Sequence, residues 1–575
     1  MSLGSSIPAR LRAPARSVRD ALREATADTR QRRAAVRRHE RSMAPVTAPR
    51  RVTEPRLRVQ VLATTRMRAG LAGQWELTDR DPEAVLLEVD ATSAVSIEAP
   101  FAEQRRAAMA ADVPVIVWVT ASSRVVTADV TRLLEGVTAP VHVVVDDEES
   151  VDDWAAGLGR RVQHAGPAAD AAVHSPAIVG STLRREPVVA LVGDGAFDRG
   201  RLAPVQPERV DVLAGDDTES ELPGDRPVLG HYRAAAFVAD RPLTAWHAVE
   251  AAAAGTALLV GSDVTSLPGA LSEQACPVDG DAQLRQQVIA HLWQDEVVDR
   301  SAVATARTVR RGHTFAHRAA DLEALVGHPG DGRRGRPGSP FDRSVSAVIS
   351  TNRVHELDTI ADNMARQSAV TSGDLQVVLV LHGLEVSAAA VEARFRDQGL
   401  DQLVVVAADS SLTLGACLNL GIDAADGAHI AKIDDDNFYG RHYLDDLVDA
   451  IDFSGAGIVG KWAHYTWLRS TGAVVLRFPR SEHRYERLVQ GGSILMRGDV
   501  ARELRFSDLP RAVDTDLLDR AQSAGVRTYS SDRFNYVSIR GTDRHAHTWT
   551  LEDAAFMNRT SRVVFYGDPR QHVDV

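Results

Sequence analysis

Short apolar runs recur along the chain from Leu57 onward, and most are followed by the amphipathic pattern of a helix. Before residue 327 these runs are RLRVQVLA, EAVLLEVD, VPVIVWVT, PVHVVVDD, PVVALVGDG, RVDVLAGDD and TALLVG. Continuous apolar runs that alternate with helices are typical of parallel strands covered by helices. The alternation predicts an α/β fold with two Rossmann-like halves, which ends in a helical stretch from Asp281 to about Val326.

A segment dense in glycine, proline and arginine, GHPGDGRRGRPGSP, then interrupts the alternation. It has no apolar periodicity, which is typical of an interdomain linker. Beyond it the strand-like runs return as SVSAVIS, LQVVLVL, QLVVVAA and AHIAKI. Since 575 residues are too many for one core, we expect several parts. These are a basic segment over 1–56, an α/β region over 57–326, a linker over 327–343 and a second α/β domain over 344–575.

The formal net charge is −12, although the first 56 residues are rich in arginine. An acidic chain argues against nucleic acid as the main partner, because surfaces that follow phosphates are normally basic. The basic segment has two interpretations: a solvated helix or mobile tail, or an arm that contacts anionic lipid or a partner protein. The sequence leaves open whether the chain forms a homo-oligomer.

The two cysteines, Cys276 and Cys417, are far apart and lie in apolar surroundings. This pattern fits a reducing compartment and excludes a disulfide framework. No apolar run approaches the roughly 18 residues needed to cross a bilayer, and arginines stand where a signal peptide needs its apolar stretch. We expect a cytoplasmic protein, which the basic segment would bring to the inner face of the membrane if it binds lipid.

The segment HIAKIDDDNFYG, residues 429–440, runs from an apolar strand directly into three aspartates. Unpaired carboxylates are costly to bury, so they should lie at the exposed end of the strand. In an extended backbone Asp434 and Asp436 project together while Asp435 points away. Two adjacent carboxylates favour Mg²⁺ or Mn²⁺, whose other ligands are commonly substrate phosphates. The alternative is a solvated turn.

Only Lys432 and Lys461 are lysines among the 66 basic residues. Lys432 stands two residues before the aspartates, and a compact ammonium group suits a diphosphate as a point charge. We therefore predict that Lys432 contacts a bound diphosphate.

From Ser344 to Trp549 the chain resembles the family-two, inverting glycosyltransferases with the GT-A fold. The resemblance is carried in order by AVISTNR, LGACLNLGIDAADG, IDDDNFYGRHYLDDL, VQGGSILMR, VDTDLLDRAQSAG and HAHTW. It implies a metal-dependent enzyme that moves a sugar from a nucleotide diphosphate donor, by family habit a UDP-sugar, to a hydroxyl group. The family's usual acceptors imply a glycan or polyol phosphate of a cell-surface polysaccharide or wall polymer.

Residue by residue, the resemblance assigns one set to the nucleotide and its sugar: Ser350, Thr351, Asn352, Arg353, Gly415, Asn419, Asp435, Gly491 and Gly492. It assigns Asp434 and Asp436 to the metal, with His547 completing the shell in preference to His545. Asp514 takes the place of the general base, which removes the proton of the acceptor hydroxyl during a single inverting displacement. Asp516 is its substitute, and a helix-capping carboxylate is the alternative interpretation of Asp514.

Two features of this domain depart from the family pattern or allow two interpretations. His382 and Gly383 stand where an acidic pair is usual, which leaves the contact to the nucleotide base open. In KWAHYTWL, the aromatic residues Trp462, Tyr465 and Trp467 form either a platform for acceptor sugars or part of a core.

The region before the linker resembles a degenerate GT-B glycosyltransferase of the spore-maturation type. HYRAAAFVADRPLTAWHAVEAAAAGTALLVGSD and RRGHTFAHRAADLEALVG carry the resemblance, and Glu250 matches the acid that holds the donor's ribose there. The paired acid of that family would lie near Pro242, where this chain has no glutamate. We therefore expect a scaffold or an acceptor-binding role for this region.

Two other functions compete with glycosyl transfer. One is nucleotidyl transfer, which also uses paired aspartates, although the glycine-rich, lysine-bearing loop expected after SVSAVIS is missing. The other is a catalytically inactive protein that binds carbohydrate or organises a complex.

Overall fold

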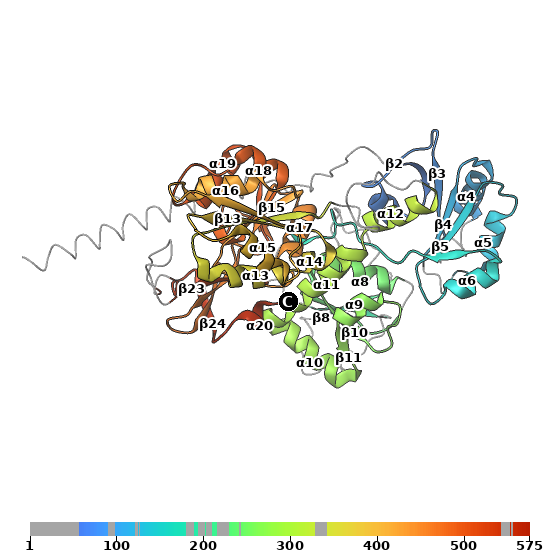
Figure 1. Cartoon of the computed structure of the whole chain (residues 1–575). Helices are drawn as coiled ribbons and strands as arrows, with labels where there is room; N and C mark the ends of the chain where they lie inside the picture. The colour runs from blue at the N-terminus through green and yellow to red at the C-terminus, as the bar shows by residue number, and fades with distance from the viewer. Residues whose placement is uncertain are drawn as a thin grey trace, which may run out of the picture. The chain divides into compact units, whose positions relative to one another are not determined.

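The computed structural model describes residues 57–89, 98–120, 125, 127–179, 189–193, 202, 210–214, 229–240, 243–327, 342–541, 553 and 556–575. The predicted basic segment and most of the predicted linker lie outside these residues. Within the described residues the strands form four sheets (Figure 1). Parallel pairing prevails in three of these sheets, so the predicted α/β class is confirmed.

The first sheet is entirely parallel, with the order β2-β1-β3-β4-β5-β6. Its strands are β1 (Arg58–Leu62), β2 (Glu76–Leu77), β3 (Ala84–Val89), β4 (Val115–Val119), β5 (Val141–Val145) and β6 (Val162–His164). Its helices are α2 (Thr65–Leu71), α4 (Glu98–Ala110), α5 (Thr127–Leu134) and α6 (Val151–Leu158). This order, with the first strand between the second and third, is common in doubly wound sheets.

The second sheet repeats that order of strands as β11-β10-β9-β7-β8, again all parallel. The strands are β7 (Val189–Gly193), β8 (Val210–Ala214), β9 (Ala234–Phe237), β10 (Ala257–Gly261) and β11 (Cys276–Val278). The helices are α7 (Pro176–Val179), η6 (Leu229–His231), α8 (Thr244–Ala253), α9 (Gly269–Gln274), α10 (Gly280–Trp293), α11 (Asp295–Gly312) and α12 (Phe315–Leu325). The helical stretch predicted from Asp281 is thus three helices, because the backbone is extended at Gln294 and again at Thr314.

The third sheet has eight strands in the order β14-β13-β12-β15-β21-β17-β22-β20. They are β12 (Val345–Thr351), β13 (Leu375–His382), β14 (Leu403–Ala408), β15 (His429–Ile433), β17 (Ile458–Gly460), β20 (Arg484–Tyr485), β21 (Leu495–Arg497) and β22 (Thr528–Ser530). β12 to β15 are parallel, and the chain order reverses between β12 and β15. Ligands of open α/β sheets bind at the carboxyl ends of the strands at such a reversal.

The fourth sheet has the order β16-β23-β18-β19-β24. Its strands are β16 (Phe438–Tyr439), β18 (His464–Leu468), β19 (Ala473–Arg477), β23 (Tyr536–Arg540) and β24 (Ser561–Tyr566). The remaining helices are η7 (Val354–Glu356), α13 (Leu357–Ala365), α14 (Ser368–Ser372), α15 (Ala388–Arg396), α16 (Leu414–Asp423), α17 (Tyr443–Ser454), η8 (Gly491–Ser493), α18 (Gly498–Leu504), α19 (Val513–Ser523) and α20 (Arg570–Val573). Because β16 follows β15 after a short turn, the two sheets meet beside that turn.

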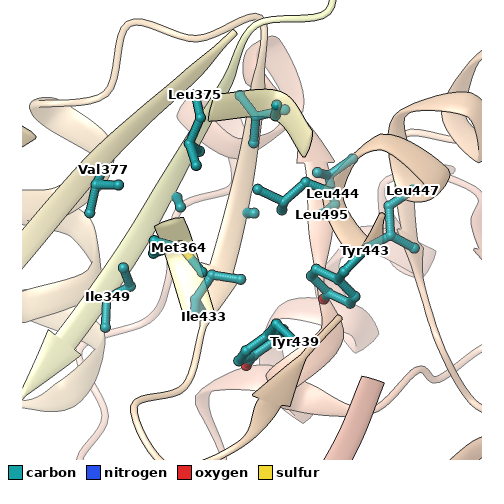
Figure 2. Close-up of a cluster of buried hydrophobic side chains, with 14 of the residues drawn as sticks. Ile349, Met364, Leu375, Val377, Ile433, Tyr439, Tyr443, Leu444, Leu447 and Leu495 are labelled. Carbon is teal, nitrogen blue, oxygen red and sulfur yellow. The ribbon is translucent and has the colours of Figure 1, made fainter. Parts of the chain in front are cut away.

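Alternating residues of β12 build the two cores of the third sheet. Ile349 packs with residues of α13 and α17, and Figure 2 shows it in the cluster that contains Tyr439 and Tyr443. Val348, on the opposite face, packs with residues of α16, α18 and α19. Each face of β12 is therefore covered by helices, and only the strand ends remain for a site.

Helix α11 joins the region before the linker to the C-terminal sheets through buried ion pairs. Arg307 donates two hydrogen bonds to Asp446 of α17, at 2.7 and 2.8 Å. Asp299 of α11 accepts a hydrogen bond from Arg533 at 2.7 Å, and all four side chains are buried. The two predicted α/β parts thus share a charged, buried interface.

Candidate functional site

The three aspartates lie in a turn that joins β15 to β16. β15 ends at Ile433, Asp435 and Asp436 are in the turn, and β16 begins at Phe438. The predicted extended backbone over the aspartates is therefore wrong, since aspartate and asparagine favour turns by hydrogen bonding to nearby backbone. Asp434 has partners of its own, whereas Asp435 and Asp436 share Arg353.

Asp434 is held at three points. Its Oδ1 accepts a hydrogen bond from Lys432 Nζ at 2.6 Å, and its Oδ2 accepts one from Asn437 at 3.2 Å. Its backbone N–H donates to Tyr439 Oη at 2.8 Å, and that hydroxyl donates to the carbonyl of Gly492 at 2.8 Å. Burial and the neighbouring carboxylates raise the pKa of Asp434, against the opposing effect of Lys432.

Asp435 faces the end of the neighbouring strand β12. Its carboxylate accepts a hydrogen bond from Thr351 Oγ1 at 2.6 Å and one from Arg353 at 2.6 Å. The side chain is buried, and burial raises the pKa of Asp435 to about 6 although Thr351 and Arg353 favour the charged form. The residue thus ties β15 to β12 across the reversal of strand order, and its predicted contact with the donor stays a prediction.

Asp436 shares a cation with Asp435. Two nitrogens of Arg353 each donate to Asp436 Oδ2 at 3.1 Å, so one guanidinium group bridges both carboxylates. These contacts raise the pKa of Arg353 despite its partial burial. Thr351 and Arg353, which the family resemblance assigns to the nucleotide, lie beside the aspartates, and their contact with a nucleotide stays a prediction.

Gly491 and Gly492 pass close to the carboxylates, as a short helical turn, η8, ahead of β21. A side chain at Gly491 would collide with Oδ2 of Asp514, and one at Gly492 would collide with Oδ2 of Asp434. A larger residue at either position would therefore force a carboxylate to move. The backbone of both glycines lies against the carboxylates, and their predicted role at the donor sugar stays a prediction.

Asp514 lies in the first turn of α19, which follows Ala512 in a left-handed conformation with φ 57°. Its Oδ1 is 3.3 Å from Lys432 Nζ, the same ammonium group that contacts Asp434. The sequence-predicted base and the sequence-predicted metal ligand thus belong to one cluster. Asp516 faces away from it, because its Oδ2 accepts hydrogen bonds from Ser507 at 2.6 Å and Arg520 at 2.8 Å.

The cluster suits a divalent cation by its charge. The three aspartates of the turn and Asp514 bring four carboxylates, while Lys432 and Arg353 bring two positive charges, which leaves an excess of two negative charges. Asp434 and Asp436 supply hard oxygen ligands of the kind that Mg²⁺ and Mn²⁺ prefer. No three histidine, cysteine, aspartate or glutamate side chains within the described ranges form a cation site.

Four predicted donor residues have other surroundings. Ser350 points toward Cys417 of α16, whereas Asn352 is exposed beyond the strand end. Gly415 lies against the carbonyl of Ser507, which leaves no room for a side chain. Asn419 exchanges two hydrogen bonds with the backbone of Phe506, at 2.8 and 2.9 Å, so its amide packs α16 against the chain before α19.

The third predicted metal ligand, His547, and its neighbour His545 lie outside the described residues. The aromatic segment divides between two environments. Tyr465 is fully buried and donates to Glu296 of α11 at 2.9 Å, so it belongs to a core and forms no platform. Trp462 is half-buried and stacks on Phe478 with a centroid distance of 4.3 Å, and Trp467 is half-buried beside Arg469.

Sequence reasoning missed Asn437 and Tyr439, which fix the orientation of Asp434. The signal was present, since both follow the aspartates directly in DDDNFY. Their importance depends on the turn, which brings both side chains back onto Asp434. An extended strand would have pointed them elsewhere.

In the region before the linker, Glu250 of α8 forms an ion pair with Arg66 of α2 at 3.0 Å and lies 4.0 Å from His174. Burial opposes ionisation of Glu250, but Arg66 and the nearby histidines outweigh it and hold its pKa below the usual range. The ion pair thus joins α2 of the first sheet's region to α8 of the second sheet's region. The predicted role of Glu250 at a ribose stays a prediction. No described helix is long and apolar enough to cross a bilayer.

No protein-family profile matches the chain. No curated protein sequence matches it either. Among solved structures, the chain matches S. aureus TarS 1–349 in complex with UDP-GlcNAc, with 15% identity over 36% of this chain and 62% of that chain and a TM-score of 0.30. It also matches the mannosyltransferase PcManGT from Pyrobaculum calidifontis in complex with GDP-Man and Mn²⁺, with 15% identity over 35% of this chain and 57% of that chain and a TM-score of 0.28. The chain therefore spans less than two thirds of either structure, and matches of this size place no residue of the site.

Proposed function

We propose that residues 344–575 form a metal-dependent, inverting glycosyltransferase that moves a sugar from a nucleotide diphosphate donor to a hydroxyl group. One observation carries this proposal: Asp434 and Asp514 contact the same ammonium group at the strand ends beside the reversal of strand order. A group that binds the leaving diphosphate and a group that accepts a proton must act on opposite sides of one sugar carbon. Asp434 and Asp514 lie in one cluster, which supports their action on the same sugar.

Asp514 is the proton acceptor in this proposal. Its carboxylate takes the proton of the acceptor hydroxyl while that oxygen attacks the anomeric carbon from the side opposite the diphosphate. Asp434 and Asp436 would hold Mg²⁺ or Mn²⁺, which when bound stabilises the negative charge of the leaving diphosphate. The backbone of Gly491 and Gly492 lies against the carboxylates of Asp514 and Asp434, and in this proposal it contacts the donor sugar.

The finer identity of the substrates follows from the family resemblance. It favours a UDP-sugar as donor and a glycan or polyol phosphate of a cell-surface polymer as acceptor. The half-buried pair of Trp462 and Phe478 offers an aromatic face that suits a sugar ring. The basic N-terminal segment would hold the protein at the inner face of the membrane, and the region over 57–326 would act as scaffold or acceptor site.

A panel of nucleotide sugars, each assayed for release of nucleoside diphosphate with manganese and with a chelator, tests the proposal. One donor should be consumed only with the metal, and Asp514→Asn should lower turnover by about 10²–10⁴-fold. Asp516→Asn is the matched control from the same helical turn, and it should keep turnover within about threefold of wild type. Release of pyrophosphate would instead indicate nucleotidyl transfer. If no donor reacts, glycosyl transfer is refuted.

One observation favours a second candidate, a catalytically inactive protein that binds carbohydrate. Lys432 and Arg353 already neutralise part of the charge on Asp434 and Asp436, which lowers the need for a metal. Calorimetry with glycans and nucleotide sugars, in the presence of manganese, separates the two functions. Binding of a glycan with no binding of any donor would support the inactive protein.

A further inference from the structure

Three acceptor oxygens surround the ammonium group of Lys432. Nζ lies 2.6 Å from Asp434 Oδ1, 3.1 Å from the carbonyl oxygen of Gly491 and 3.3 Å from Asp514 Oδ1. The side chain is only 5% exposed. An ammonium group has three N–H donors and no acceptor. Asp434 and Gly491 accept hydrogen bonds from Nζ, whereas Asp514 is paired with it by charge alone. These three partners and its burial set the ammonium group toward the protein, and its predicted contact with a diphosphate stays a prediction.

The presence of lysine at this position indicates that the site needs a compact cation. The chain contains 66 basic residues, and all except Lys432 and Lys461 are arginines. Both lysines are buried, and Lys461 also contacts an aspartate, Asp532, at 3.1 Å. A guanidinium group is larger and presents five donors in a flat fork, whereas an ammonium group is a compact point charge. Both buried sites take the compact ammonium group.

The three acceptors come from separate parts of the chain. Asp434 follows β15, Gly491 belongs to η8, and Asp514 lies in α19. Without a cation between them the carboxylates of Asp434 and Asp514 would repel each other in a poorly solvated place. The ammonium group therefore offsets this repulsion and fixes the distance between the two carboxylates.

We propose that Lys432 is a positioning residue that holds Asp514 against Gly491 and in register with Asp434, and that it is not a ligand of the donor. We call this arrangement of Lys432, Asp434, Gly491 and Asp514 the clamp, and its contacts do not depend on the proposed function. Its effect on turnover rests on the proposed function. Its consequence is specific: Lys432 acts on the transfer step only through the position of Asp514.

A double-mutant cycle over Lys432→Met and Asp514→Asn tests this inference. Lys432→Met should lower kcat at least 100-fold with the donor KM within threefold, and should lower it less than threefold further when Asp514 is already asparagine. Independent, multiplicative losses would overturn the inference. So would a tenfold rise in donor KM at unchanged kcat, because that result identifies a donor ligand.

Manganese affinity without donor gives a readout apart from turnover. Lys432→Met should bind manganese at least as tightly as wild type, because Asp434 loses a competing cation, and a tenfold weaker affinity would overturn the inference. Lys461→Met is the matched control: it should lose thermal stability but keep kcat per folded molecule. If Lys432→Met does not fold, the double variant, which loses one charge of each sign, is compared with Asp514→Asn alone. A kcat of the double variant that is lower by threefold or more overturns the inference.

Failure of the proposed function is distinguishable from failure of this inference. If wild-type protein releases no nucleoside diphosphate from any donor, glycosyl transfer fails, and the clamp is then decided by the crystal structure of Lys432→Met. Displacement of the Asp514 carboxylate from Gly491 by about 1 Å or more supports the clamp. A carboxylate that stays in place overturns it.

Discussion

Oδ1 of Asp514 lies 3.3 Å from Nζ of Lys432, and Oδ2 of the same carboxylate lies where a side chain of Gly491 would have to be. Both oxygens of the candidate base are thus set by neighbours from other segments. The position of this carboxylate depends on a lysine that holds it and on a glycine that leaves it room.

Gly491→Ala should lower turnover about 100-fold, because the new methyl group displaces Asp514, and a displacement near 1 Å is sufficient for a loss of that size. Steady-state kinetics with the donor found in the panel measures it. Gly269→Ala is the control, since a methyl group there meets no atom within 4 Å. Unchanged turnover in Gly491→Ala would show that the crevice has more room than the structure gives it.

Arg353→Met should weaken donor binding and lower turnover at least tenfold. The change leaves Asp435 buried with Thr351 as its remaining partner, and removes the cation that joins Asp435 to Asp436. A buried carboxylate that loses its cation is strongly destabilising to its surroundings. Isothermal titration with the donor and steady-state kinetics measure the two effects.

Arg394→Met provides the comparison for this variant, because Arg394 forms an exposed ion pair with Asp358 on the same domain. Exposed pairs contribute little, so donor affinity should stay unchanged. Equal losses in both variants would mean that the loss of any arginine, and not of the bridge between Asp435 and Asp436, causes the effect.

Much of the C-terminal sheet was predictable because its strands are continuous apolar runs, a pattern typical of strands covered by helices on both faces. The short strand β16 was not, since two residues carry no periodicity. The sequence analysis correctly placed Asp434 and Asp436 at the end of a strand, but it predicted an extended backbone where the chain turns. Periodicity alone does not show where a strand ends, and here it ends at Ile433.

The partners of the site residues were harder to predict than the residues. Lys432 was singled out by its rarity, yet its partner Asp514 is far away in the sequence, and only the packing of α19 brings the two together. Asn419 was assigned to the donor from the resemblance, whereas its amide bonds the backbone of Phe506. Sequence spacing predicts local neighbours, and these contacts are long-range.

Arg307→Met should destabilise the protein by about 3–5 kcal/mol, because Asp446 then stays buried without its cation. The reason is the interface of α11 with α17, to which Arg307 contributes a bidentate ion pair. Urea denaturation of the whole chain measures the change. Arg562→Met is the control: Arg562 is 50% exposed and 3.9 Å from Asp295, so its loss should cost less than about 0.5 kcal/mol. Similar midpoints for the two variants would contradict a stabilising interface.

Stability should fall as the pH drops below about 6.5, in part because of His464. Burial, with a smaller effect from Arg477, lowers the pKa of His464 to about 3, and its Nδ1 lies 2.8 Å from the carbonyl oxygen of Trp462. In the unfolded chain the histidine takes a proton below about pH 6.5, whereas in the folded protein it stays neutral until about pH 3. Stability is therefore lost across that window, by roughly 3 kcal/mol at pH 4.5 from this residue.

His464→Asn keeps an N–H donor for the carbonyl of Trp462 but has no titrating ring. The difference between its urea midpoints at pH 7.5 and pH 4.5 should accordingly be smaller than in wild type. Other buried or half-buried histidines, whose pKa burial lowers to about 4, keep part of the dependence in both proteins: His247, His313, His317, His429 and His442. His355→Asn serves as the comparison, because the His355 side chain is 76% exposed and its loss should leave the difference as in wild type. An equal pH dependence in His464→Asn and wild type would mean that His464 is already protonated in the folded protein, which would contradict the effect of its burial.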